Sequence, residues 1–335
     1  DPRGHAGRPA VRPSVRRGAA ALALLLAGCA PVYWTDWRSP LGRTHPLAGK
    51  ILDVRADGFV SPRELVARLA ASRYVLLGER HDNPDHHVLQ ARLVRALAAA
   101  GRRPAVGFEM LATDQSAALA RWLAQSPRDA AGLGHAVGWK DSGWPDWAQY
   151  QPIAQAALDA GLPIVATNLS RAALRALRAG GVEGLGPALR RELGLEQPLA
   201  PAARAAMARE IRESHCGQGA DALIEKMVDT QWARDARLAE ALVRAGRRDG
   251  AVLIAGAGHV RRDRGVPLHL LRREPGATLA SLAFLEVQTR AATPAGYLDE
   301  GERTLPFDYV WFTPRNDDAD PCEKFRKPLE RLRTS

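Results

Sequence analysis

YVLLGERHDNPDHH, residues 74–87, joins an apolar run to a helix through a polar loop and decides the fold. Residues 74–77 favour a strand, and Gly78 ends that run. Asp85 can cap a helix from residue 86 to about residue 100, where apolar side chains recur on one helical face. We therefore expect a strand, a polar loop at its carboxyl end, and a helix that packs back on the sheet.

The same unit recurs along the chain. Further strand-like runs occupy residues 104–108, 163–166, 251–255 and 280–284. Strands that alternate with helices predict an α/β fold, with a mostly parallel sheet flanked by helices. Residues 171–245 lack such runs and are rich in Ala, Arg and Leu, which predicts a small helical-bundle subdomain. The α/β domain would then comprise residues 51–170 and 246–335.

Residues 1–28 have the pattern of a bacterial signal peptide. Five arginines precede an apolar run too short to span a bilayer, and the run ends in Leu26-Ala27-Gly28-Cys29, which is similar to a lipobox. We expect cleavage before Cys29, lipidation (palmitate) of its thiol, and a tether over residues 29–50. Ala30 replaces the Asp that resemblance to known lipoproteins associates with inner-membrane retention. The expected location is the periplasmic side of the outer membrane of a Gram-negative bacterium.

The formal net charge of +10 does not indicate a nucleic-acid partner. It arises from 47 basic and 37 acidic residues, and most of the basic residues are arginines at helical spacing. Such arginines are typical of solvated helix faces whose aliphatic stems lie on the core. Part of the excess also belongs to the predicted signal peptide. The charge that remains suits the carboxylates of a small ligand or anionic lipid headgroups.

Polar side chains follow four of the predicted strands. The carboxyl ends of parallel strands meet at one edge of a sheet, where ligands bind. The residues expected there are Glu79, His81, His86, His87, Glu109, Asn168 and His259. Imidazole and carboxylate groups can hold a divalent metal, exchange protons, or contact the iron and propionates of haem. Each alone could equally cap a helix or form an ion pair, so the prediction rests on their convergence.

Several segments resemble the ChaN family of haem-binding lipoproteins. They keep a consistent order between residues 50 and 330 and comprise residues 77–87, 107–111, 142–150, 215–217, 231–235, 256–260 and 306–312. The resemblance implies an α/β domain with a small helical domain, and haem bound at a homodimer interface with Tyr and His involved. The candidate haem ligands are His81, His86, His87, Tyr150 and His259. Tyr150 is chosen only because it lies in a matching Trp-rich segment. The implied partners are haem or iron, and a membrane through the lipid anchor.

The resemblance extends to a wider superfamily that includes Tiki metalloproteases and erythromycin esterases. It therefore implies an alternative, in which the chain is a metal-dependent hydrolase. His81, Glu109 and His259 would hold a divalent metal, and Glu79 would act as general base on a bound water.

Two cysteines follow the predicted signal peptide, Cys216 and Cys322. An oxidising compartment permits a disulfide between them, which would tie the helical subdomain to the C-terminal segment. The alternative is two inert buried thiols, because the sequence does not fix the distance between their Cα atoms.

Overall fold

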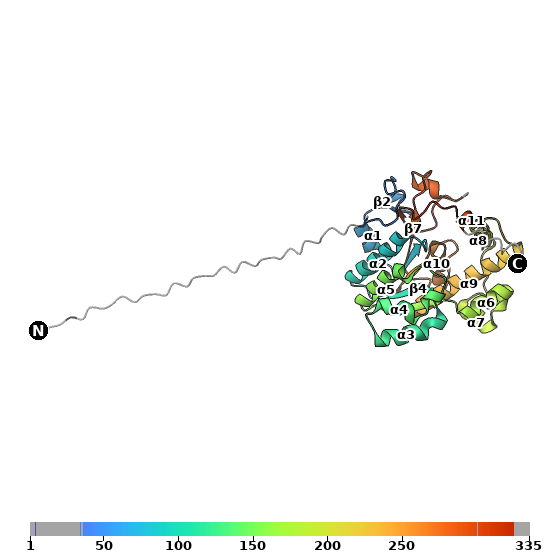
Figure 1. Ribbon diagram of the computed structural model, residues 1–335, viewed down its shortest axis with the longest axis horizontal. Helices are drawn as coiled ribbons and strands as arrows, with labels where there is room; N and C mark the ends of the chain where they lie inside the picture. Colours follow the sequence, from blue (N-terminus) through green and yellow to red (C-terminus); the bar gives the residue numbers. More distant parts are fainter. Residues whose placement is uncertain (1–3, 5–33, 35, 300, 325–335) are drawn as a thin grey trace. The chain divides into compact units, whose positions relative to one another are not determined.

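The strand predicted at residues 74–77 lies in the interior of the sheet (Figure 1). The computed structural model describes residues 4, 34, 36–299 and 301–324. β3 (Tyr74–Glu79) pairs in parallel with β6 (Ala251–Gly256) on one side and with β7 (Leu279–Glu286) on the other. All its residues are buried, as expected for a strand with neighbours on both sides and helices on both faces.

The sheet has eight strands in the order β2-β1-β8-β7-β3-β6-β4-β5. The others are β1 (Ile51–Asp53), β2 (Gly58–Val60), β4 (Ala105–Ala112), β5 (Ile164–Asn168) and β8 (Tyr309–Thr313). Only β1 pairs antiparallel, with β2 and β8. The predicted α/β fold with a mostly parallel sheet is confirmed, and all five predicted strands are present. β1, β2 and β8 lie outside the predicted set, and three residues in each of β1 and β2 are too few to show a periodicity.

Helices cover both faces of the sheet (Figure 1). One face packs against α1 (Pro62–Ala70), α2 (Pro84–Ala99), α3 (Ser116–Gln125), α4 (Ala130–Ala136) and α5 (Trp147–Asp159). There Leu89, Phe108 and Ile153 belong to one core. The other face packs against α10 (Val266–Arg273) and the second half of α9 (Asp221–Ala245), with Leu242 and Leu270 in a second core.

α2 begins at Pro84, two residues earlier than predicted. Asn83 is its cap, and its side chain accepts a hydrogen bond from the Asp85 backbone N–H at 2.9 Å. Proline suits the first helical position because it has no N–H that would need an acceptor there. Asp85, predicted as the cap, instead accepts hydrogen bonds from the backbone N–H groups of Arg38 at 2.7 Å and Ser39 at 2.9 Å.

The tether predicted over residues 29–50 is wrong for residues 38–50, which pack onto the domain. Ser39 is buried, Leu41 forms an antiparallel bridge with Arg315, and Leu47 lies in the core. The Asp85 carboxylate holds the start of this segment, and a composition rich in proline and glycine gives no sign of that contact. Cys29 and, apart from residue 4, the predicted signal peptide lie outside the described residues.

Residues 171–245 are largely helical but are not separated from the sheet. α6 (Arg171–Gly180), α7 (Pro187–Leu193), α8 (Pro201–Ser214) and the first half of α9 share a third core, which includes Leu177, Met207 and Val228. α9 then continues into the layer that packs on the sheet, and the described residues between 34 and 324 form one compact unit. Within the described part of the chain, no helix has the length and apolar character needed to cross a membrane.

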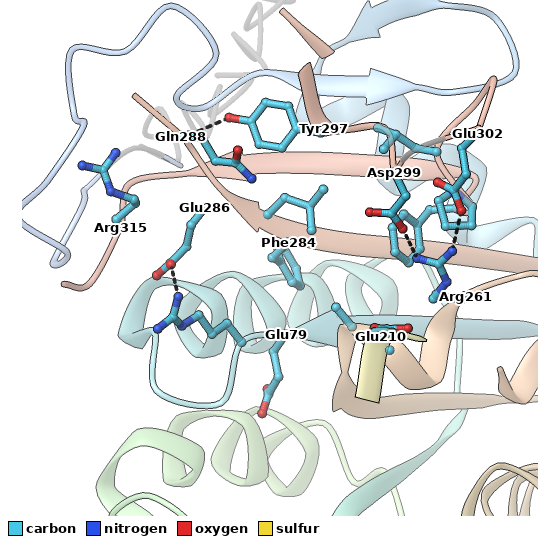
Figure 2. Close-up of a pocket in the computed structure, with 17 residues that line it drawn as sticks. Glu79, Glu210, Arg261, Phe284, Glu286, Gln288, Tyr297, Asp299, Glu302 and Arg315 are labelled. Atoms are coloured by element: carbon cyan, nitrogen blue, oxygen red, sulfur yellow. Dashed lines mark hydrogen bonds and ion pairs between the residues drawn. The ribbon is translucent and has the colours of Figure 1, made fainter. Parts of the chain in front are cut away.

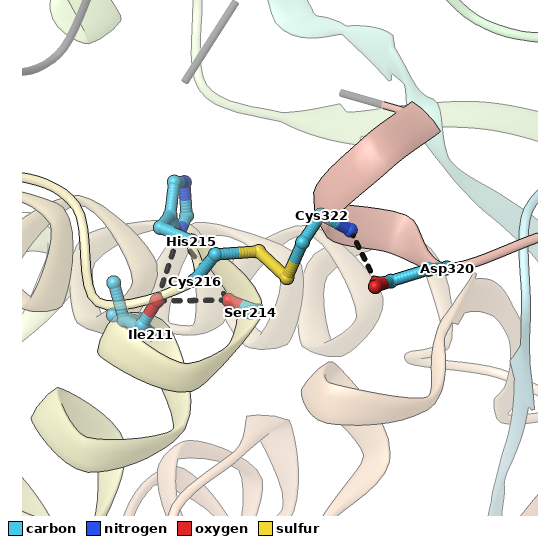
Figure 3. The surroundings of a disulfide bond; sticks show 6 residues. All are labelled: Ile211, Ser214, His215, Cys216, Asp320 and Cys322. Atoms are coloured by element: carbon cyan, nitrogen blue, oxygen red, sulfur yellow. Dashed lines mark hydrogen bonds between the residues drawn. A yellow bond between two sulfur atoms is a disulfide. The ribbon is translucent and has the colours of Figure 1, made fainter. Parts of the chain in front are cut away.

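Cys216 and Cys322 form a disulfide, with their Cα atoms 5.8 Å apart (Figure 3). Cys216 lies in the turn after α8, and Cys322 lies in α11 (Pro321–Lys324). The bond therefore ties the helical part to the C-terminal segment across 106 residues of sequence. Of the two alternatives that the sequence leaves open, the structure contains the bridge.

Replacing both Cys216 and Cys322 by Ser is expected to lower the free energy of unfolding by about 2–5 kcal/mol, because the bond restricts the unfolded chain. Urea unfolding at neutral pH measures this loss. A thiol reductant should produce the same loss in the wild type and no change in the variant. A wild-type unfolding midpoint that ignores the reductant would contradict the expectation.

Candidate functional site

The carboxyl ends of three strands bring predicted polar residues together. Glu79 ends β3, Glu109 lies in β4, and His259 lies in a short 3-10 turn after β6. Gly78 lets that turn lie against β3, because a Cβ on Gly78 would be 2.3 Å from Val260 Cγ2. All three polar side chains are buried, so they form the floor of the site.

Glu79 is the centre of a first polar cluster. Its Oε1 accepts hydrogen bonds from Tyr150 Oη at 2.6 Å and from His81 Nδ1 at 2.9 Å. His87 Nε2 lies 3.4 Å from Oε2 without the alignment of a hydrogen bond. Burial alone would raise the pKa of Glu79, but His87 and His81 hold it well below its usual range. The carboxylate is therefore an anion at neutral pH.

Glu109 is the centre of a second polar cluster. Its Oε2 accepts a hydrogen bond from the Gly256 backbone N–H at 2.7 Å, and its Oε1 contacts both Arg234 and, at 3.1 Å, His259 Nε2. His259 donates from Nδ1 to Asp235 Oδ1 at 2.5 Å. Burial opposes a charge on His259, but Glu109 and Asp235 raise its pKa to about 9. The ring is therefore an imidazolium that donates to two carboxylates.

His86 is closed to ligands, so its prediction as a haem ligand is wrong. The ring is buried and lies against Phe284, with centroids 5.5 Å apart. Its Nδ1 accepts a hydrogen bond from the Arg80 backbone N–H at 2.8 Å, and its Nε2 donates to Thr313 Oγ1 at 2.8 Å. Burial lowers the pKa of His86 to about 3 and keeps the ring neutral. Both nitrogens are used in holding the β3–α2 loop on the sheet.

Tyr150 and His87 are also enclosed. Their ring centroids lie 4.3 Å apart, and neither side chain is more than 1% exposed. The Tyr150 hydroxyl is bonded to Glu79, and burial beside that carboxylate raises the pKa of the phenol. The phenol therefore stays protonated and does not reach the surface, so the structure gives no support to Tyr150 as a ligand.

His81 is the predicted ligand that remains accessible. Its side chain is 35% exposed, and its ring meets Trp144 edge to face at 4.9 Å. Gly256 leaves room for this ring, since a Cβ there would lie 3.0 Å from His81 Nε2. Because Nδ1 donates to Glu79, the lone pair of the neutral ring is on Nε2.

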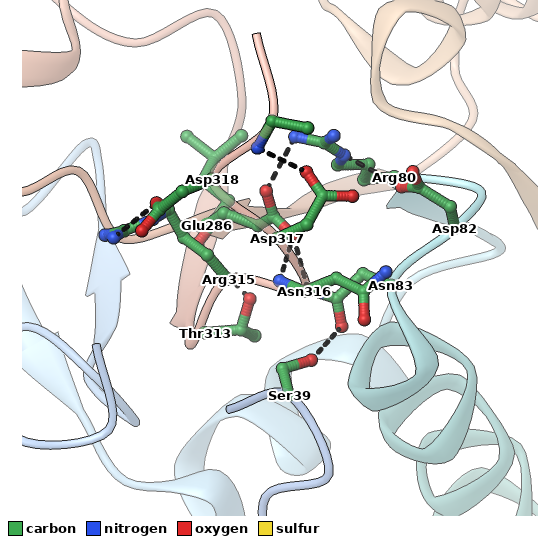
Figure 4. A network of polar contacts seen from close by, with 12 residues as sticks. Ser39, Arg80, Asp82, Asn83, Glu286, Thr313, Arg315, Asn316, Asp317 and Asp318 are labelled. Carbon is green, nitrogen blue, oxygen red and sulfur yellow. Dashed lines mark hydrogen bonds and ion pairs between the residues drawn. The ribbon is translucent and has the colours of Figure 1, made fainter. Parts of the chain in front are cut away.

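A network of polar contacts fixes the loop that carries His81 (Figure 4). The Asn83 amide and the Asn316 backbone N–H both donate to Glu286 Oε1, at 2.7 and 3.0 Å. Arg80 pairs with the other oxygen of the same carboxylate at 2.7 Å. The loop is thereby tied to the C-terminal segment, which the disulfide ties in turn to the end of α8.

The residues predicted to bind a metal do not fit one. The Arg234 guanidinium occupies the position of a cation beside Glu109, and His259 has a hydrogen on each ring nitrogen, so it has no lone pair to give. Over residues 36–299 and 301–324, together with 4 and 34, no group of three or more His, Cys, Asp or Glu side chains is placed to hold a metal ion. The hydrolase alternative, with Glu79 as general base, gains no support.

A pocket of about 420 Å³ lies beside Glu79, between β7 and residues 297–307 (Figure 2). Each arginine on its walls is paired with a carboxylate. Arg261 pairs with Glu302 at 2.8 Å and Arg80 with Glu286 at 2.7 Å, and the third arginine, Arg315, pairs with Asp318 at 2.7 Å. This pocket therefore has no arginine that lacks a carboxylate partner.

A second depression lies between the sheet edge and the helical part, and of the polar residues expected at the strand ends Asn168 lines it. Two adjoining hollows of about 290 and 540 Å³ share Arg178, Thr230 and Arg234 on their walls, and together we name them the cationic groove. Its walls include the apolar side chains of Met110, Trp144, Leu169, Leu174, Ile211, Leu223 and Met227. Its polar wall residues include Arg171, Lys226 and His215.

The cationic groove carries an excess of positive charge, with Asp141 as the acidic residue on its walls. Arg171, Arg178 and Lys226 form no ion pair with a carboxylate in the described part of the chain, whereas Arg234 pairs with Glu109. The signals for this groove in the sequence are Asn168, expected at a strand end, and the family resemblance, which includes Met110 and Trp144 and the segments 215–217 and 231–235. Helical periodicity shows that these segments are helical but not which face lines a hollow.

By its fold and site, the chain is an α/β protein with a groove between the sheet edge and a helical part. It belongs to the family described as haem-binding uptake, Tiki superfamily, ChaN, whose model matches residues 65–270. No curated protein matches the chain.

Three solved structures are similar to the chain, and the first of them shares its fold. ChaN of Campylobacter jejuni, in a structure described as cofacial haem binding, is 23% identical and has a TM-score of 0.61, over 78% of this chain and 95% of the other. The type III effector HopBA1 is 15% identical, with a TM-score of 0.40 over 75% and 92% of the two chains. The erythromycin esterase EreC is 16% identical, with a TM-score of 0.41 over 82% and 84%.

The charged state of His259 predicts a pH dependence. Its pKa in the folded protein, about 9, exceeds the ordinary value of 6.5, so its contribution to stability is complete below about pH 6.5 and is lost as the pH rises through 9. Glu109→Gln should lower the pKa of His259 by more than one unit, measured from imidazole NMR shifts against pH. Glu196→Gln, an exposed control, should leave it unchanged. An unshifted His259 in the first variant would contradict the assignment.

Proposed function

We propose that the chain binds haem in the cationic groove and serves haem or iron uptake or handling. One observation carries the proposal: a single groove combines apolar walls, unpaired cations and an imidazole. Haem is a flat apolar macrocycle with two propionates at one edge and an iron that accepts protein ligands. Each property of the groove therefore matches one part of the haem molecule.

The apolar walls would supply most of the affinity. Removing apolar surface from water contributes roughly 25 cal/mol per Å², and the walls are formed by long side chains that remain partly exposed, among them Leu174, Ile211 and Met227. A macrocycle lying on them would cover apolar surface on both partners. The pocket beside Glu79 also has apolar wall residues, among them Phe284, Leu305 and Phe307, but each of its arginines is already paired with a carboxylate.

The cations would fix the orientation of the ring. Arg178 and Lys226 lie on the walls of the same hollow as Ile211 and Leu223. A hydrogen bond to a charged group contributes about 1.5–3 kcal/mol, less where solvent screens it. Arg178 is exposed, so its contribution to propionate binding should weaken at high ionic strength.

The family supports haem over other apolar anions, because its description names haem binding. The C. jejuni relative is described as binding haem cofacially, an arrangement in which two macrocycles stack face to face. We infer that two copies of this chain bring their grooves together around stacked haems. Haem should then convert a monomer into a dimer when molar mass is followed during titration.

Haem titration of the mature chain tests the proposal directly. Micromolar haem should produce a Soret band that saturates, and the absence of a Soret shift would refute haem binding. Arg178→Glu should weaken haem binding about tenfold or more at low salt, because it replaces an attraction to a propionate by a repulsion. Arg175→Glu is the matched control: this arginine is exposed one turn earlier on α6, does not line the groove, and should leave the affinity unchanged.

A lipid anchor at Cys29 would place this function at the membrane. The lipobox-like sequence before Cys29 supports anchoring to the outer membrane on the periplasmic side. In a Gram-negative host, the full chain should incorporate radiolabelled palmitate and fractionate with membranes, whereas Cys29→Ser should do neither. The Cys216→Ser, Cys322→Ser double variant should be labelled like the wild type, and labelling that persists without Cys29 would refute the anchor.

A further inference from the structure

A smaller hollow, of about 240 Å³, lies between the end of α7 and α10. Its walls include Arg191, Gln197, His269, Arg272 and Arg273, and we name it the arginine pocket. It shares no wall residue with the cationic groove or with the pocket beside Glu79. Pockets for drug-sized ligands measure roughly 300–1,000 Å³, so this hollow suits a smaller molecule or an ion.

The arginine pocket contains a buried imidazole that no protein group satisfies. His269 lines the pocket and is only 3% exposed. Its Nε2 is buried and has no hydrogen-bond partner among the described residues. The same holds for Nε1 of Trp232, whose ring lies against His269 with centroids 3.9 Å apart. A buried polar atom without a partner opposes folding, and a ligand in the pocket could supply the partner that His269 lacks.

The surroundings of His269 keep its ring neutral and favour an anion beside it. Burial, together with the charges of Arg272 and Arg273, lowers the pKa of His269 to about 3. At neutral pH one ring nitrogen therefore carries a hydrogen and can donate it. The positive charges that oppose an imidazolium attract a negatively charged ligand, so the donor and the cations act on the same kind of group.

Two arginines of α10 have guanidinium donors to spare. The Arg272 guanidinium lies over the Trp232 ring, 5.2 Å from its centroid, and Arg273 donates to the Glu192 carbonyl oxygen at 2.7 Å. Within the part of the chain that the structure describes, neither forms an ion pair with a carboxylate. Each guanidinium has five N–H groups in a flat fork that matches the oxygens of a phosphate.

The carboxylates on the walls leave this positive charge in place. Glu192 is paired with Arg237 at 2.8 Å, and Glu196 lies 3.9 Å from Arg191, with both of the latter side chains mostly exposed. An exposed pair at that distance contributes little. Arginines in the last turn of α10 also offset the partial negative charge of the helix end. That effect requires no buried imidazole, so it does not account for His269.

We propose that the arginine pocket binds a phosphate group, as the free ion or as a small phosphomonoester. Arg272 and Arg273 would donate to its oxygens, and His269 would donate a further hydrogen bond. A phosphate group offers at least three strong acceptor oxygens and close to two negative charges, so it can meet all three side chains at once. A carboxylate has only two oxygens. The site is separate from the cationic groove and does not depend on haem binding.

Isothermal titration calorimetry of the mature chain with inorganic phosphate, at constant ionic strength, tests the site. The wild type should bind one phosphate. Arg272→Glu should weaken binding tenfold or more, because a repulsion replaces an attraction. Arg248→Glu is the matched control, since this arginine is exposed and does not line the pocket, and it should leave the affinity unchanged. No saturable binding up to tens of millimolar phosphate, or an equal loss in both variants, would overturn the proposal.

His269→Phe separates a role in binding from a role in packing. The variant keeps a ring and removes the unpaired nitrogens, so without phosphate it should be at least as stable to urea as the wild type. Its affinity for phosphate should nevertheless fall several-fold. In the wild type, phosphate should shift the NMR signals of the His269 ring. Unshifted signals, or a less stable variant that binds phosphate normally, would show that His269 only packs and would overturn its role in the site.

Glycerol 3-phosphate and phosphatidic acid vesicles distinguish two sources of the phosphate group. The small volume of the pocket predicts that glycerol 3-phosphate binds and that Arg272→Glu abolishes its binding. Vesicles of phosphatidic acid in phosphatidylcholine should bind the wild type and Arg272→Glu alike in a sedimentation assay. Binding that depends on Arg272 with vesicles alone would assign the pocket to a lipid headgroup and overturn the proposal of a free ion or small ester.

Discussion

Two carboxylates, Glu79 and Glu109, are buried as anions at the edge of the sheet, and the site depends on how each charge is compensated. Removing an ion from water costs several kcal/mol unless it is paired and hydrogen-bonded. Glu109 is paired with Arg234 and the His259 imidazolium, and His259 requires the second carboxylate of Asp235. Arg234 and Asp235 are neighbours on α9, so compensating one buried anion in β4 docks that helix on the sheet.

The docking of α9 places the wall of the cationic groove. Lys226, Thr230 and Arg234 are spaced four residues apart and lie on one face of a helix. Arg234 pairs with the buried Glu109 carboxylate. Thr230 and Lys226, one and two turns earlier on α9, therefore lie along the groove. The polar residues at the strand ends therefore stabilise the fold, because their charges are paired with one another. The charge left over for a ligand is on the helices.

The sequence could predict the sheet and the meeting of Glu79, Glu109 and His259, because strand runs are local patterns and parallel strands share one edge. It could not predict what these groups would bond to. Arg234 reaches Glu109 from 125 residues away, and the burial of Tyr150 depends on α5 packing against α2. The alternation of apolar residues and their helical spacing describe single elements. They therefore do not distinguish a ligand from a buried hydrogen-bonding group, as at His86. They also do not distinguish a tether from a packed segment, as at residues 38–50.

The helical part has a smaller core than the sheet, and this sets where the protein can move. α6, α7 and α8 share their core with α9 as far as Ala236, and Leu268 of α10 packs against it, whereas the end of α9 from Leu238 belongs to the sheet layer. Local opening of these helices would therefore leave the sheet intact, and ligand sites are commonly drawn from such regions of low local stability. The disulfide limits the opening at the end of α8, where it bonds the helical part covalently to the C-terminal segment. A ligand that bridges the groove would stabilise the closed arrangement in proportion to its affinity, so binding and closure are one equilibrium.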